Sequence, residues 1–314
     1  MPEKGLFLQN IIALIWDFDK TLSPHNMQRP IFEAYGVDEA QFWAEVNALP
    51  AYYGRAKIEV QPDTSYLGHL LAYVQHGKMA DLSNARLREL GEQVEFFPGV
   101  PECFDNLKRA LDESAYRDAD IHLEHYIVST GLTAMIDGSG ITDKVDGVWA
   151  SSFIESPAGP DTDLNGTPAP GVITQVAGAL DNTTKTRAIF EINKGVNMGV
   201  GISVNDTIAR DARRVPFNNM IYIADGPSDI PSFSVVGSNG GLAYAVYDPA
   251  DQKRFEQAVE LQRTDRVDDK GVADYRETSE TYRWLHLHIR KIADRMIEER
   301  AEVTKSQVTK GPSH

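Results

Sequence analysis

The chain of 314 residues contains little cysteine and little positive charge, and each shortage excludes a class of protein. Cys103 is its one cysteine, so no disulfide can form within the chain, and we expect a reducing compartment. Lysine and arginine number 31 against 46 aspartates and glutamates, which gives a formal net charge of −15. This excess argues against nucleic acid or an anionic membrane as the main partner. It does not exclude a small anionic substrate, because one local cation can outweigh the overall charge.

Long hydrophobic runs are also missing. The apolar stretch over residues 6–16 is interrupted by Gln9 and Asn10, leads directly into Asp17, and is too short to span a bilayer. No small-residue cleavage pattern follows it, and no other stretch is long and apolar enough for a membrane helix. We therefore expect a cytoplasmic protein in which this stretch is a buried strand.

Three apolar runs are each followed by small or polar residues; they cover residues 11–16, 125–131 and 220–226. Continuous apolar runs are typical of strands that are buried on both faces of a parallel sheet. Helical patterns lie between them, over residues 98–114 and 184–195. The alternation predicts an open parallel α/β sheet flanked by helices. Ligands of such sheets bind beyond the carboxyl ends of the strands, where all three polar clusters fall.

Two inserts interrupt this pattern. Residues 23–95 carry few strand signals and are predicted to be helical, whereas residues 148–182 contain a Pro/Gly/Asp-rich stretch typical of a long hairpin. We expect a discontinuous core over residues 1–22 and 96–250, and a helical domain over residues 23–95 inserted after the first strand. Residues 251–314 are expected to form a helical C-terminal extension.

Asp17 and Asp19 follow the first strand and are separated by a single phenylalanine, Phe18. Two carboxylates this close repel each other, and burying either one costs several kcal/mol unless it is paired or bound to a cation. The pair therefore indicates a site with a specific charge requirement.

Four motifs, in order along the chain, resemble those of the haloacid dehalogenase-like (HAD) hydrolase superfamily. Each contributes polar residues: Asp17, Asp19 and Thr21 in the first, Ser129 in the second, Lys185 in the third, and Asp225 and Asp229 in the fourth. The resemblance spans roughly residues 11–247 and implies a Rossmann-like HAD sheet. It also implies a phosphatase (phosphoric monoester hydrolase) that is Mg²⁺-dependent and forms an aspartyl-phosphate on a small phosphorylated metabolite.

The resemblance assigns a role to each motif residue. Asp17 would attack phosphorus, Asp19 would carry the proton to and from the reacting oxygens, and Lys185 would offset negative charge. The metal ligands would be Asp17, Asp19 through its backbone carbonyl, Asp225 and, acting from nearby, Asp229. The phosphate-binding residues would be Thr21, Ser129, Thr130, Gly131 and Lys185. Ser129 fits the second-motif spacing better than Thr130, and the choice between them stays open.

Other lysines are weaker candidates for the third motif. Lys144 follows the second motif too soon, and Lys194 lies at the far end of the predicted helix, where a cation offsets the helix dipole. True dehalogenases of the superfamily lack the second aspartate of the first motif, because a departing halide needs no proton. Asp19 therefore favours a phosphatase.

The position of the helical insert resembles a C1-type cap and places the chain nearest to the phosphoserine phosphatase-like branch. That enzyme carries a glutamate nine residues after the nucleophile, where this chain has Asn26, which weakens phosphoserine as the substrate. Residues of the insert that could face a substrate are Arg29, Trp43, Tyr52, Tyr53, Arg55 and Lys57.

Two alternatives to hydrolysis remain open from the sequence. One is a catalytically silent HAD-like binding protein, and the other is a phosphotransferase to an acceptor other than water. In the preferred interpretation the partner is a small-molecule phosphomonoester, and neither nucleic acid nor a membrane is expected as a partner. Whether the chain forms a homo-oligomer stays open.

Overall fold

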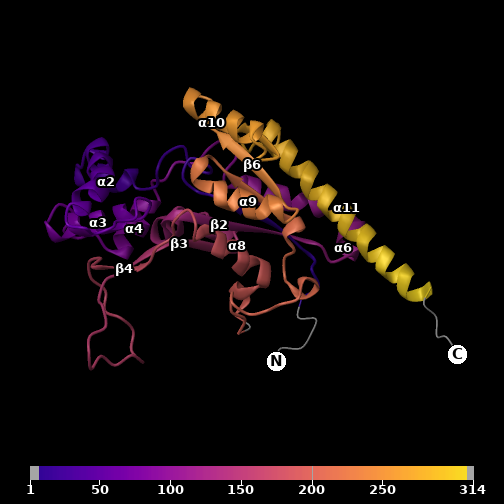
Figure 1. Ribbon diagram of the computed structural model, residues 1–314, viewed down its shortest axis with the longest axis horizontal. Coiled ribbons are helices and arrows are strands. Elements are labelled where there is room, and N and C mark those ends of the chain that lie inside the picture. Colours follow the sequence, from indigo (N-terminus) through magenta and orange to yellow (C-terminus); the bar gives the residue numbers. More distant parts are fainter. Residues whose placement is uncertain (1–6, 200, 310–314) are drawn as a thin grey trace.

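The computed structural model describes residues 7–199 and 201–309 and is built around a seven-stranded sheet in the order β4-β3-β2-β1-β5-β6-β7 (Figure 1). The strands are β1 (Ile11–Trp16), β2 (His122–Leu132), β3 (Gly147–Ile154), β4 (Gln175–Gly178), β5 (Met220–Ala224), β6 (Leu242–Tyr247) and β7 (Asp269–Val272). All neighbours are parallel except β3 and β4, which pair antiparallel. The predicted open parallel sheet is confirmed, with the addition of one antiparallel edge strand, β4.

Strand β1 lies at the centre of the sheet, and all six of its residues are buried. It pairs with β2 on one side and β5 on the other, so that Ile15 lies opposite both Tyr126 and Tyr222. The backbone N–H of Asp17 donates to the carbonyl of Ile223 at 2.9 Å, which extends this pairing by one residue. Asp17 therefore leaves the sheet at its middle, where ligands of open α/β sheets bind.

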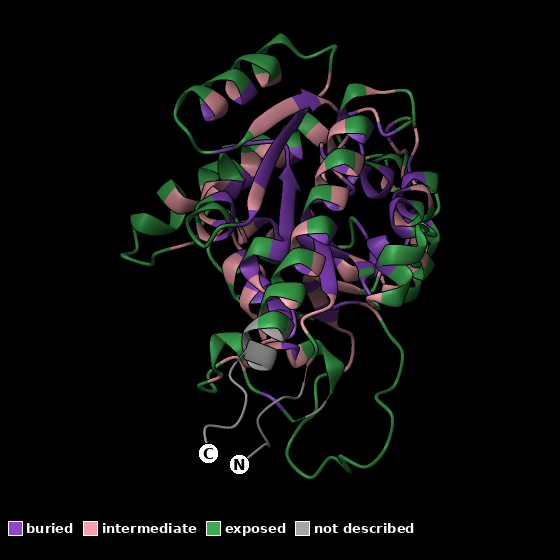
Figure 2. Cartoon of the chain, turned by 90° about the vertical axis from the view of Figure 1, so that its right-hand side faces the viewer, coloured by how far each residue is buried: buried purple, intermediate pink, exposed green. Residues whose placement is uncertain are grey.

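Helices cover both faces of the sheet. Successive side chains of β1 point to opposite faces, and each face is the base of one apolar cluster. Ile12, Leu14 and Trp16 pack on the face covered by α5 (Glu102–Lys108), α7 (Thr133–Gly138) and α11 (Glu280–Thr309). Ala13 and Ile15 pack on the opposite face. That face is covered by α8 (Lys185–Lys194), α9 (Ile230–Ser238) and α10 (Gln252–Arg263). A short helix, α6 (Ser114–Asp118), precedes β2. Figure 2 shows the buried strands enclosed by half-exposed helices.

The chain leaves the core after β1 and forms a group of helices that lies beside the sheet (Figure 1, indigo). These are α1 (Arg29–Tyr35), α2 (Glu39–Gly54), α3 (Ser65–Gln75) and α4 (Asn84–Gly91). Helices α2 and α4 are each capped at the N-terminus by a side chain. Asp38 accepts from the backbone N–H of Gln41, and Ser83 accepts from that of Arg86. We call residues 23–95 the cap; its boundaries stay a prediction.

Strands β3 and β4 form the predicted hairpin, whose intervening loop of residues 155–174 is mostly exposed (Figure 2). The hairpin contacts the cap through hydrogen bonds. The N–H of Ile173 donates to the carbonyl of Leu82 at 2.9 Å, and that of Asn84 donates to Glu155 Oε1 at 2.6 Å. The hairpin therefore connects the edge of the sheet to the cap.

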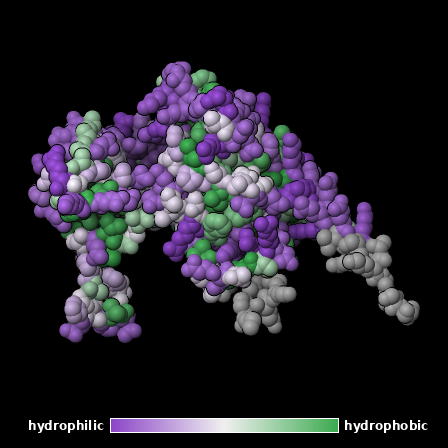
Figure 3. All heavy atoms as spheres, in the orientation of Figure 1, coloured by the Kyte–Doolittle hydropathy of each residue, from purple (hydrophilic) through white to green (hydrophobic). Residues whose placement is uncertain are grey.

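The prediction of a helical extension over residues 251–314 needs a correction, because Asp269–Val272 form β7 at the edge of the sheet. This strand was missed because its sequence, DKGV, has no apolar run. It pairs with β6 alone, at the edge of the sheet, so backbone hydrogen bonds can keep it in place with few apolar side chains. Among the described residues no helix, the long α11 included, is apolar and long enough to cross a membrane. In Figure 3, most of the surface in view is hydrophilic.

Candidate active site

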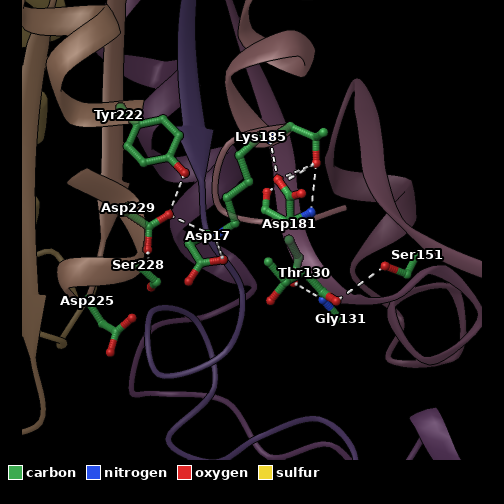
Figure 4. A network of polar contacts seen from close by, with 12 residues as sticks. Asp17, Thr130, Gly131, Ser151, Asp181, Lys185, Tyr222, Asp225, Ser228 and Asp229 are labelled. Atoms are coloured by element: carbon green, nitrogen blue, oxygen red, sulfur yellow. Dashed lines mark hydrogen bonds and ion pairs between the residues drawn. The ribbon is translucent and has the colours of Figure 1, made fainter. Parts of the chain in front are cut away.

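Lys185 lies between two buried carboxylates at the carboxyl end of β1 (Figure 4). Its Nζ donates to Asp17 Oδ1 at 2.7 Å and to Asp229 Oδ1 at 2.8 Å, and all three side chains are almost fully buried. Lys185 is the first residue of α8, and Asp181 holds this helix start by accepting from the N–H of Thr184 at 2.6 Å. The sequence therefore places the lysine by starting a helix at a fixed point above β1.

The charged side chains of this group shift one another's pKa values. Burial raises the pKa of Asp17 well above its usual range, although the Lys185 ammonium lowers it. Burial lowers the pKa of Lys185, but the carboxylates of Asp17 and Asp229 raise it by more, so that it ends well above its ordinary value. Lys185 is therefore a permanent cation between the two acids.

Asp229 is held by three donors. Besides Lys185, the hydroxyl of Tyr222 donates to Asp229 Oδ1 at 2.7 Å, and the hydroxyl of Ser228 donates to Asp229 Oδ2 at 2.9 Å. Both of its oxygens are thus engaged, which fixes the position of the carboxylate. Tyr222 was missed from the sequence because it looks like one more apolar residue of β5.

Asp225 completes an acidic cluster with Asp17 and Asp229, in which one carboxylate oxygen from each lies within 4.8 Å of the others. Its Oδ2 accepts from Arg254 Nη1 at 2.7 Å. Burial raises the pKa of Asp225 to about 6, although Arg254 opposes this shift. Arg254 lies on α10, and no local motif marked it as part of a site.

Asp19 also reaches the site, but it is not part of that acidic cluster. Its Oδ1 accepts from the backbone N–H of Met27 at 2.8 Å, and burial raises its pKa to about 7. Thr21 is fully buried, and its Oγ1 has no hydrogen-bond partner among the described residues. Its carbonyl accepts from the hydroxyl of Tyr275 at 2.5 Å, a residue that the sequence did not indicate.

The two candidate residues of the second motif, Ser129 and Thr130, lie in different surroundings. The Ser129 hydroxyl accepts from the N–H of Gly131 at 3.0 Å, and it is Thr130 that lines the cavity described below. The pairing of β2 with β3 shifts register between Val128 and Leu132, which changes the side that each residue faces. This irregularity could not be seen in the VSTG sequence.

These residues surround a cavity of about 210 Å³ between the sheet edge and the cap. Its lining residues are Asp17, Asp19, Lys20, Asn26, Gln28, Trp43, Asp63, Tyr66, Thr130, Lys185, Asp225, Ser228 and Arg254.

Of the cap residues expected to face a substrate, Trp43 lines the cavity, whereas Arg29, Tyr52, Tyr53, Arg55 and Lys57 do not. Thr21, Ser129, Gly131 and Asp229 are not among the residues that line it. A wider depression of about 780 Å³ elsewhere, lined by residues such as Arg213 and Phe217, contains none of the motif residues.

Residues of all four motifs meet at the carboxyl edge of a mostly parallel sheet, which is the arrangement that the resemblance to HAD hydrolases implies. No protein-family model matches the chain. A protein of Borreliella burgdorferi (strain ATCC 35210 / B31), named as uncharacterized, is 36% identical over 283 residues. The match covers 88% of this chain and 96% of that protein. The chain belongs to the same family as this Borreliella protein.

Several solved structures are similar to the chain. A probable phosphoserine phosphatase from Vibrio cholerae has a TM-score of 0.48 at 14% identity, covering 92% of this chain and 68% of the other. A HAD family hydrolase from Salmonella enterica serovar Typhi has a TM-score of 0.46 at 11% identity, covering 86% and 68%. A phosphoserine phosphatase with a phospho-aspartyl intermediate analogue has a TM-score of 0.46 at 18% identity, covering 88% and 97%. Likenesses of this strength assign neither an activity nor a substrate to the chain.

Proposed function

We propose that the chain is a Mg²⁺-dependent phosphomonoester hydrolase that acts through an aspartyl-phosphate on a small phosphorylated metabolite. The observation that carries the proposal is the buried contact of Lys185 with Asp17 and Asp229, beside Asp225. A folded protein gains nothing from gathering more buried carboxylates than cations, unless a ligand supplies the missing positive charge. The four-motif resemblance supports the same chemistry.

The acidic cluster suits a Mg²⁺ ion, which prefers carboxylate and carbonyl oxygens. Asp17 and Asp225 would hold it, because each uses only one carboxylate oxygen in the hydrogen bonds seen among the described residues. The backbone carbonyl of Asp19 is the third ligand that the resemblance implies. Asp229, with both oxygens engaged, would act by holding Lys185 in place. When bound, the metal ion supplies positive charge that offsets the anionic phosphate and nucleophile.

The reaction would take place in two displacements at phosphorus. In the first, an Asp17 carboxylate oxygen forms a bond to phosphorus while the bond from phosphorus to the leaving oxygen breaks, and Asp19 gives that oxygen its proton. In the second, Asp19 takes a proton from a water molecule whose oxygen attacks phosphorus. The bond to Asp17 then breaks, and inorganic phosphate leaves. Lys185 and the hydroxyl of Thr130 would stabilise the charge on the phosphoryl oxygens.

The test is phosphate release from a panel of sugar, polyol, amino-alcohol and nucleotide monophosphates, with phosphoserine included, in Mg²⁺ and in EDTA. We expect hydrolysis that stops in EDTA, returns with added Mg²⁺, and falls by at least about 10³-fold in Asp17→Asn. Asp112→Asn is the matched control, because Asp112 is exposed on the surface away from the cavity. Full activity of the Asp17 variant, or turnover that is indifferent to EDTA, would refute the proposal.

The same panel separates the two alternatives. A wild-type protein that binds Mg²⁺ in a calorimeter but hydrolyses no ester would be a HAD-like binding protein. If added alcohols receive the phosphoryl group in preference to water, the protein is a phosphotransferase, and phosphorylated alcohol would be detected in place of inorganic phosphate.

A further inference from the structure

The wall of the cavity has two halves of different chemistry. The cations of its described lining residues, Lys20, Lys185 and Arg254, all belong to the half outside the cap, beside the acidic cluster. The cap half contributes Asn26, Gln28, Trp43, Asp63 and Tyr66. Its described lining residues therefore include amides, aromatic rings and one carboxylate, but no cation. The phosphoryl group belongs to the first half, so the second half faces the leaving group.

Gln28 is the most deeply buried polar side chain of the cap half, with only 2% of its surface exposed. It directly precedes α1, and its carbonyl accepts from the N–H of Ile31 at 2.9 Å, so the backbone here is held by the start of the helix. Its side-chain Oε1 has no hydrogen-bond partner within residues 7–199 and 201–309. An unpaired buried acceptor is destabilising, and a ligand that donates to it removes the penalty.

Tyr66 lines the same half of the cavity as Gln28, and its own hydroxyl is already engaged. The Tyr66 hydroxyl donates to the carbonyl of Thr130 at 2.7 Å. Because its one hydrogen is used on Thr130, Tyr66 cannot also donate to the Gln28 oxygen. The Gln28 oxygen is therefore left for a donor on a ligand.

Trp43 supplies a rigid apolar surface beside these polar groups. Its Nε1 donates to Glu39 Oε1 at 3.2 Å, and its ring packs edge-on against Phe32 and Phe42, with centroids 6.2 and 5.4 Å away. With its polar atom satisfied on the surface of α2, the indole offers only carbon to the cavity. This surface suits the carbon skeleton of a ligand.

We propose, resting on the phosphatase function above, that the substrate is the phosphate ester of a small uncharged polyol whose hydroxyl donates to Gln28 and whose carbons pack on Trp43. A carboxylate or a second phosphate on the leaving group would meet no cation on the cap half. An ammonium would be buried against a neutral amide, since Asp63 is exposed and accepts from Asn182 at 2.7 Å. The volume of about 210 Å³ lies below the range of about 300–1,000 Å³ for drug-sized ligands, which favours a small leaving group.

The test compares esters that differ in single groups: glycerol 1-phosphate, n-propyl phosphate, phosphoethanolamine and phosphoserine. For the wild-type protein we expect kcat/KM for glycerol 1-phosphate to exceed that for each of the others by at least about tenfold, the range of one buried hydrogen bond. In Gln28→Met, which keeps the length of the side chain but removes its acceptor, the ratio of glycerol to propyl ester should fall to near one. In Gln28→Glu the preference should move towards phosphoethanolamine.

Gln41→Met is the matched control, because Gln41 lies on α2 of the same cap and its side-chain amide donates to Glu45, outside the cavity. It should keep the wild-type ratios. Circular dichroism and thermal unfolding establish that each variant is folded, and Gln28→Glu provides a second reading if Gln28→Met does not fold. Turnover of p-nitrophenyl phosphate without preference for the glycerol ester, or a preference for phosphoserine, would overturn this inference alone. Failure to hydrolyse any ester would overturn the phosphatase function with it.

Discussion

Two clusters of buried charge lie on the same face of the sheet, and they differ in their balance. The strand cluster joins β2 to the loop before β5: Arg214 Nη1 donates to Glu124 Oε2 at 2.6 Å and to the Tyr126 hydroxyl at 2.8 Å. One cation there meets one carboxylate and one phenol. No acid is left over, and the cluster has the composition of a structural ion pair.

The cavity cluster has a similar composition but a different charge. Lys185 again meets a tyrosine-bound carboxylate, that of Asp229, but it is shared with the carboxylate of Asp17. Asp225 adds another acid, for which Arg254 supplies the cation. When all three acids are ionised, the group carries one more negative charge than positive charge. The comparison teaches that a buried ion pair indicates function when its charges do not cancel and the surplus faces a cavity.

Replacing the cation of the cavity cluster should give the largest effect. Lys185→Met leaves Asp17 and Asp229 unpaired and removes a charge from beside the phosphoryl group, so we expect kcat/KM to fall by roughly 10²–10³-fold. The free energy of unfolding should fall by about 3–5 kcal/mol, as when one partner of a buried pair is removed. Steady-state kinetics and urea unfolding measure the two. Activity within threefold of wild type would mean that Lys185 is only structural.

The equivalent change in the strand cluster should separate stability from activity. Arg214→Met leaves Glu124 half-buried and unpaired, so we expect the free energy of unfolding to fall by about 2–4 kcal/mol. Because the strand cluster does not line the cavity, kcat/KM at 20 °C should stay within threefold of wild type. Loss of activity in a folded Arg214 variant would break the distinction between the clusters.

A buried group without charge, His125, extends the comparison to the opposite face of the sheet. Trp16 Nε1 donates to His125 Nδ1 at 3.2 Å, which leaves Nε2 to donate to the Phe104 carbonyl at 3.1 Å, so the neutral ring satisfies both contacts. Burial lowers the pKa of His125 from 6.5 to about 3. Between these values the unfolded chain binds more protons, so stability should fall as the pH drops below 6.5.

The loss expected from His125 between pH 7 and pH 5 is about 2 kcal/mol. His125→Gln keeps a donor and an acceptor but cannot titrate, so its unfolding free energy should depend less on pH by that amount. Urea unfolding of both proteins at the two pH values measures the difference, since acid effects shared by both cancel. Equal pH dependence would show that His125 does not titrate in this way.

The smallest effect is expected at Arg254, the cation that lies against Asp225. Its positive charge opposes the approach of a divalent ion, so Arg254→Gln should bind Mg²⁺ about two- to fivefold more tightly, a difference typical of a partly exposed ion pair. Titration calorimetry with Mg²⁺ alone measures this, and Arg254→Lys should keep the wild-type affinity. Weaker binding in Arg254→Gln would instead mean that Arg254 positions Asp225 for the metal.

The sequence predicts those parts of the fold and the site that have a local signal. The apolar run over residues 11–16 predicted β1, and the first residue of a helix pattern predicted where Lys185 would lie. The short edge strand β7 was missed because its four residues have no hydrophobic pattern. Its register with β6 depends on pairing rather than on composition.

The residues that surround the motif groups could not be predicted in this way. Arg254, Tyr222 and Gln28 are ordinary residues of a polar helix, an apolar strand and a loop, and only the tertiary fold brings them to the cavity or, for Tyr222, to Asp229. The choice between Ser129 and Thr130 depends on a register shift of β2 that no sequence pattern marks. Long-range contacts of single residues leave no periodicity in the sequence.

Tyr275 connects three distant parts of the chain. Its hydroxyl donates to the carbonyl of Thr21, where the chain leaves for the cap, and its N–H donates to the carbonyl of Pro98 at 2.7 Å, where the chain returns. Both points at which the chain crosses between the core and the cap are thus hydrogen-bonded to one residue of the C-terminal segment. Shortening the chain before Tyr275 would remove both bonds and weaken the attachment of the cap, although the residues lost belong to neither crossing.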